Sequence, residues 1–106
     1  MDRPLLVYTT FPDEGAALAV GRELIAEKLA ACVNVLPGMK SVYAWKGAIE
    51  TGDEVVAIVK TRDGLKERVR EALKARHPYE TPIILFLEVA GGDQATVDWL
   101  LGETGA

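Results

Sequence analysis

The sequence holds one cysteine, Cys32, and one histidine, His77, and these two side chains are its first candidates for chemistry. A thiolate and an imidazole both bind copper and zinc, so the two residues could together bind such a metal. Their spacing follows no zinc-finger or CxxC pattern, and two ligands do not complete a site. The alternatives are structural: Cys32 as a small apolar strand residue, and His77 as a side chain at a helix end, where a cation is favourable against the helix dipole.

The same pair could act as a nucleophile and its base, but nothing else in the sequence supports catalysis. There is no glycine-rich nucleophile elbow, and a cysteine within a strand is poorly exposed. Three carboxylates, Glu50, Asp53 and Glu54, lie close together and are interpreted as solvated turn residues. Gly91-Gly92-Asp93 is too short for a phosphate-binding loop and is interpreted as a helix cap. We therefore expect a protein that is not an enzyme.

Four further side chains form the candidate site for a small ligand: Tyr43, Trp45, Lys60 and Tyr79. Tyr43 and Trp45 are two residues apart and share one face of a predicted strand. Aromatic rings with polar tips beside a lysine could line a small cleft. The alternative is that they pack a hairpin and anchor an interface.

The elements that must position these residues follow from the hydrophobic periodicity. Strands are predicted at 5–10, 32–36, 41–45, 54–61 and 83–89, and breaks at Pro37-Gly38, Lys46-Gly47 and Thr51-Gly52-Asp53. Helices are predicted at about 14–30, capped by Asp13, from about 62 to 76, ending before His77-Pro78, and after Asp93. Gly21 inside the first helix costs about 1 kcal/mol relative to Ala, which a close approach of helix to sheet would explain.

This β-α-β, β-α-β order with a terminal helix favours an α+β ferredoxin-like sandwich, in which both main helices cover one face of an antiparallel sheet. The other face should then carry polar residues. Instead, apolar residues occupy both faces of the strands: Leu5 and Val7 against Leu6 and Tyr8, and Leu85 and Leu87 against Ile84 and Phe86. A second copy of the chain is the simplest cover for such a face. The alternative cover is the terminal helix.

Length and composition narrow the functional classes. The 106 residues, 49% of them hydrophobic, are predicted to form one domain, residues 1–106, with a substantial core. The net charge of −4 disfavours nucleic acid as a partner. A single cysteine allows no intramolecular disulfide, and no apolar run approaches the roughly 20 residues that cross a bilayer. We expect a soluble, cytoplasmic protein that binds no membrane.

Several short motifs together resemble one known family. They are Ala31-Cys32-Val33-Asn34, Pro37-Gly38, Ser41, Tyr43, Trp45, Gly47, Lys60-Thr61, His77-Pro78-Tyr79 and Thr81-Pro82. In this order and spacing they resemble the CutA family of divalent-cation tolerance proteins, and the resemblance covers nearly the whole chain. It implies a ferredoxin-like fold and a homotrimer joined by strand pairing between subunits. It also implies a response to divalent metals, with copper or another divalent ion bound through Cys32 and His77.

The chain departs from the family pattern at two positions. Arg76 stands where some members have an additional histidine, and Ile83 stands where the family usually has Glu after the proline. The leading hypothesis is a non-enzymatic homotrimer with a metal ion or small ligand in the clefts between subunits. The alternative is a trimeric signalling module that binds a small metabolite or nucleotide in those clefts.

Overall fold

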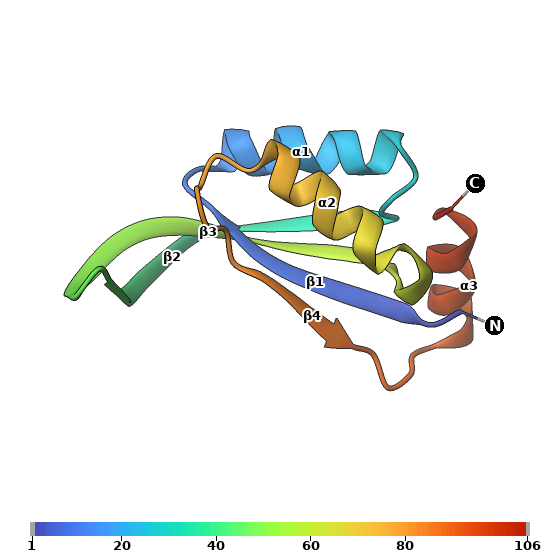
Figure 1. The fold of residues 1–106 in the computed structure, drawn as a ribbon. Helices are drawn as coiled ribbons and strands as arrows, with labels where there is room; N and C mark the ends of the chain where they lie inside the picture. Colours follow the sequence, from blue (N-terminus) through green and yellow to red (C-terminus); the bar gives the residue numbers. More distant parts are fainter. Residues whose placement is uncertain (1, 106) are drawn as a thin grey trace.

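The computed structural model describes residues 2–105, which form four strands and three α-helices around one sheet. Along the chain the elements are β1 (Pro4–Phe11), α1 (Glu14–Ala26), β2 (Cys32–Trp45), β3 (Ala48–Arg62), a 3-10 turn (Asp63–Leu65), α2 (Lys66–Arg76), β4 (Ile84–Glu88) and α3 (Gln94–Gly102). The strand order is β2-β3-β1-β4, and every neighbouring pair is antiparallel. Both main helices lie over one face of the sheet (Figure 1), so the predicted ferredoxin-like sandwich is confirmed.

The core lies between the two helices and this covered face. Alternate residues of β1 and β3 point into it and are buried, among them Leu5, Val7, Val55, Ala57 and Val59. The helices supply one apolar stripe each, made of Ala17, Val20, Leu24, Val69 and Leu73. No helix among residues 2–105 is long and apolar enough to span a bilayer.

The ends of α1 show where local sequence rules succeed and where they fail. Asp13 caps the helix as predicted, because its carboxylate accepts the backbone N–H of Ala16 at 2.8 Å. The helix stops at Ala26 instead of continuing to Ala30. Lys28 adopts a left-handed conformation (φ 60°), and the N–H of Leu29 then bonds the Leu24 carbonyl. Leu29 is still buried, so the apolar period outlasts the helix.

Gly21 lies where α1 comes closest to the sheet. A β-carbon at this position would be 3.3 Å from the Val33 Cβ of β2, a tighter contact than side chains normally make. The close approach expected from the sequence is confirmed, and it explains a residue that weakens the helix.

Strands β2 and β3 form one long hairpin that projects beyond the helices (Figure 1). The predicted break at Thr51-Gly52-Asp53 is wrong, because β3 continues through it and Gly52 pairs with Ser41. At Pro37-Gly38 the chain forms a β-bulge, with one residue more on β2 than on β3 between two paired positions. Lys46-Gly47 makes the predicted two-residue turn, with φ 49° and 82°.

The sheet face away from α1 and α2, here called the open face, is apolar in one chain. Leu36, Leu85 and Leu87 are 48%, 56% and 46% exposed on it. Helix α3 contacts β3 and β1 at the end of the sheet near the N-terminus (Figure 1), and it leaves these leucines uncovered. The terminal helix is therefore not the cover of this face.

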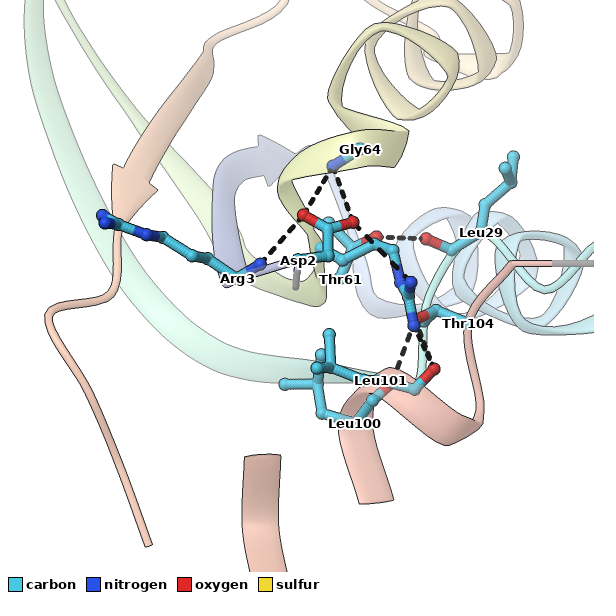
Figure 2. Close-up of polar contacts among 9 residues, drawn as sticks. Asp2, Arg3, Leu29, Thr61, Gly64, Leu100, Leu101 and Thr104 are labelled. Carbon is cyan, nitrogen blue, oxygen red and sulfur yellow. Dashed lines mark hydrogen bonds and ion pairs between the residues drawn. The ribbon is translucent and has the colours of Figure 1, made fainter. Parts of the chain in front are cut away.

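A polar cluster ties the two chain ends to the sheet (Figure 2). The Asp2 carboxylate accepts the N–H of Gly64 at 3.1 Å, at the start of the 3-10 turn. The Arg62 guanidinium lies 3.7 Å from the same carboxylate and donates to the hydroxyl of Thr104 at 3.0 Å and to the carbonyl of Leu101. Arg62 thus fixes the C-terminal end of α3 beside the N-terminal strand.

Candidate functional site

The predicted metal ligands lie far apart in one chain. Cys32 begins β2 and pairs with Lys60, which pairs with Leu6 of β1, all on the open face. His77 contacts Thr9 and Thr10 on the side of the helices, three to four residues further along β1. At about 3.3 Å per residue this is roughly 10 Å along the strand, with the sheet between the two side chains. Cys32 and His77 cannot hold one ion within a single chain.

His77 follows α2 as predicted, and its ring is fully engaged. Its ring nitrogen Nε2 lies 2.7 Å from the Thr10 carbonyl and must donate to it, while Nδ1 accepts the N–H of Tyr79 at 3.2 Å. The ring also stacks on Phe11, with centroids 4.3 Å apart. Burial lowers the pKa of His77, and the hydrogen bond to Thr10 and the charge of Glu54 only partly oppose this. His77 is therefore held neutral, and it has no free nitrogen for a metal in this arrangement.

The predicted aromatic residues lie on the open face of the hairpin. Tyr43 and Trp45 point to the same side as Glu54, because residues 39, 41, 43 and 45 pair with the even-numbered positions 54, 52, 50 and 48 of β3. Tyr79 reaches this side from the loop between α2 and β4, and its hydroxyl donates to Glu54 at 2.8 Å. Lys60 lies six residues along β3, about 20 Å away. The structure thus brings one of the four predicted ligand-binding residues, Tyr79, into contact with Glu54. Tyr43 and Trp45 share the open face with Glu54 but lie opposite positions four and six residues from it along β3, and Lys60 lies six residues away in the other direction.

Glu54 is the residue that the sequence interpretation missed. It is half-buried on the open face and is not a solvated turn residue. Burial raises its pKa, but hydrogen bonds from Ser41, Tyr79 and Thr10 and the nearby His77 outweigh this and lower it. Burial and the bond to Glu54 also raise the pKa of Tyr79, which keeps its proton. Glu54 is separated from Val56 and Ile58 by even numbers of residues along β3. This alternation was the sequence signal that could have placed Glu54 on the open face.

The residues of one chain do not fit a resident metal ion. No group of three or more His, Cys, Asp or Glu side chains within residues 2–105 is arranged to hold one. Metal sites normally use at least three protein ligands for a transition ion and more oxygens for calcium. Any metal site that uses Cys32 needs further ligands beyond those that residues 2–105 of one chain bring together.

Comparison with known proteins agrees with this fold. Residues 5–103 match the family described as CutA1 divalent ion tolerance protein. The divalent-cation tolerance protein CutA of Thermus thermophilus is 39% identical over 100 residues, which cover 94% of this chain and 97% of that protein. The chloroplastic protein CutA 1 of Oryza sativa is 40% identical over 100 residues, but these make up only 56% of its length. The chain therefore spans about half of that plant relative.

Solved structures of CutA proteins have the same fold as this chain. The crystal structure of CutA1 from Oryza sativa superposes with a TM-score of 0.94 at 39% identity, covering 97% of this chain and 94% of that one. A CutA from Archaeoglobus fulgidus, described as periplasmic, superposes with a TM-score of 0.88 at 38% identity, covering 92% of this chain and 94% of that one. Sequence and fold agree along nearly the whole chain, which belongs to the CutA1 divalent ion tolerance family.

Proposed function

We propose that the chain acts in the cytoplasm as a non-enzymatic homotrimer in the response to divalent metal ions, with its ligand site at the seams between copies. The observation that carries the assembly is the open face. Leu85 and Leu87 are about half exposed there, on a strand at the edge of the sheet. Exposed apolar patches of this kind mark interaction surfaces, and an edge strand offers unpaired backbone groups to another chain.

The projecting hairpin supports the same assembly. Val42 and Ile49 near its end are 71% and 81% exposed, although both are apolar. This part of the hairpin extends past the helices of its own chain and leaves both its faces uncovered (Figure 1). A neighbouring copy that accepts the hairpin would bury these side chains and the open face together.

Light scattering tests the assembly. We expect three times the 11.5 kDa mass of one chain at micromolar concentration. Leu87→Glu places a charge on the open face and should shift the mass toward one chain. Leu18→Glu is the matched control, because Leu18 is 40% exposed on α1, on the opposite side of the sheet. A monomer mass for the unmodified protein, or equal loss of assembly in both variants, would refute the proposal.

The metal part of the proposal has its own test. Cys32 is partly exposed on the open face, where a second copy could supply the missing ligands. His77 would have to give up its bond to the Tyr79 N–H or to the Thr10 carbonyl before it could bind an ion. Copper should be titrated calorimetrically into the protein and into Cys32→Ala and His77→Ala. Affinity that is unchanged in both variants would exclude both residues as ligands.

A further inference from the structure

The carboxylate of Glu54 carries a charge that its own chain does not balance. Tyr79 donates to Oε2, and the hydroxyls of Ser41 and Thr10 are near enough to help lower the pKa of the carboxylate. These donors are neutral, and none of the ion pairs within residues 2–105 includes Glu54. A partly buried carboxylate is normally paired with a cation. Glu54 is ionised and retains acceptor capacity, because a carboxylate offers about four acceptor positions.

Two tyrosines share the open face with this carboxylate: Tyr79 bonds to it, and Tyr43 lies opposite Glu50, four residues from Glu54 along β3. Tyr43 is 46% exposed on the same side of the hairpin, and its hydroxyl is close enough to contribute to the raised pKa of Tyr79. Glu50, directly opposite Tyr43 on β3, adds a second carboxylate to this side. Trp45 lies next along the strand, but its ring already has the Lys46 ammonium 5.6 Å from its centroid. A ligand on this surface would thus meet the Glu54 carboxylate, the exposed ring of Tyr43, and the ring of Tyr79 on the side that does not pack against His77, whose ring centroid is 5.0 Å away.

The charges of this surface decide which class of ligand fits it. A phosphate or carboxylate ligand would meet Glu54 and Glu50, and Lys60, the lysine of the predicted cleft, is about 20 Å away. A bare divalent ion would find too few ligands in the chain. A primary ammonium group needs only a carboxylate acceptor and the faces of aromatic rings, which attract cations.

We propose that Glu54, Tyr43 and Tyr79 bind the ammonium group of a small organic amine. The proposal deepens the ligand site of the homotrimer described above, and it rests on that proposed function in placing this surface at a seam between copies. The ammonium hydrogen-bonds to the Glu54 oxygen that Tyr79 leaves free, and the amine's carbon chain lies against the tyrosine rings. The Tyr79 hydroxyl holds the carboxylate in place from the other side.

The test uses n-butylammonium and butyrate, two probes of equal size and opposite charge, in NMR titrations of the assembled protein at pH 7. We expect saturable binding of n-butylammonium and none of butyrate. Glu54→Gln keeps the shape of the side chain and should weaken amine binding at least tenfold. Glu71→Gln, on the exposed face of α2, is the control and should leave it unchanged. Equal binding of both probes, or equal affinity in Glu54→Gln and the unmodified protein, would overturn the proposal.

A second variant covers the case in which Glu54→Gln does not fold. Tyr43→Leu removes one ring at an exposed position and should weaken n-butylammonium binding about threefold or more. Unchanged affinity in this variant would also overturn the proposal. Light scattering on the same samples separates this result from the assembly: a monomer mass contradicts the homotrimer, whereas a trimer that does not bind n-butylammonium contradicts only the amine site.

Discussion

Replacing His77 with Gln should remove most of the pH dependence of stability between pH 7 and 5. The sign follows from the lowered pKa of His77. As the pH falls below the ordinary value of 6.5, the unfolded chain takes up a proton that the folded chain refuses, so stability is present above that pH and is lost below it. One proton limits the slope to about 1.4 kcal/mol per pH unit.

The structure also gives the cost of the substitution at neutral pH. The Thr10 carbonyl is buried and accepts from the imidazole, and Phe11 stacks on the ring. If Gln does not reach that carbonyl, the buried acceptor is left unpaired at a cost of about 1–3 kcal/mol. We therefore expect His77→Gln to have a lower free energy of unfolding at pH 7 than the unmodified protein. Its free energy of unfolding should change less with pH, so that the two values converge toward pH 5.

Urea unfolding followed by circular dichroism at half-unit steps of pH measures both effects. Protein concentration must be equal throughout, because an assembly is stabilised by mass action. The chain has no other histidine, so no second imidazole can mimic the signal. Curves for the two proteins that run parallel from pH 7 to 5 would refute the inference that His77 is held neutral by burial.

Three further substitutions test the packing and the turns in the same unfolding assay. Gly21→Leu should destabilise the protein by about 1–3 kcal/mol, because even a β-carbon would meet Val33 at 3.3 Å, and equal stability would contradict the close approach of α1 to the sheet. Lys46→Asn should stabilise it by up to about 1 kcal/mol, because Asn accepts a positive φ more readily than Lys, and a loss of stability would contradict the turn geometry. Arg62→Met should destabilise it and increase amide exchange in α3, since the Thr104 hydroxyl and the Leu101 carbonyl each lose the hydrogen bond that Arg62 donates. Unchanged exchange would show that α3 is held without Arg62.

The elements that could be predicted are those whose signals are local. Asp13 and Asp93 cap their helices as the sequence indicated, and Pro78 follows the end of α2. The errors come from signals that tertiary pairing overrides. Gly52 suggests a break when considered alone, but β2 supplies it with a partner and β3 continues. The spacing of apolar residues continues to Leu29 because Leu29 is buried. The helix has ended by then, since Lys28 already adopts a left-handed backbone conformation.

At the candidate site, the alternation of side chains along a strand predicted the position of Trp45 but not that of Lys60. Alternation correctly put it on one face with Tyr43, because two residues along a strand always return to the same side. Lys60 was grouped with them on residue type alone. Only the register of β3 shows that it lies beside Cys32, at the other end of the open face. Pairing over a distance in sequence is a property of the assembled sheet, so composition and spacing could not supply it.

The bulge at Pro37-Gly38 determines on which face the aromatic residues lie. Leu36 and Tyr43 are seven residues apart, and in an unbroken strand an odd separation places two side chains on opposite faces. The extra residue of the bulge restores the alternation, so Leu36 pairs with Val56 and Met39 with Glu54, all on the open face. Without the bulge, Tyr43 would point to the helix side, away from Glu54. One irregular pair of residues thus brings the apolar cover surface and the polar candidate site onto the same side of the sheet, where a neighbouring copy would meet both.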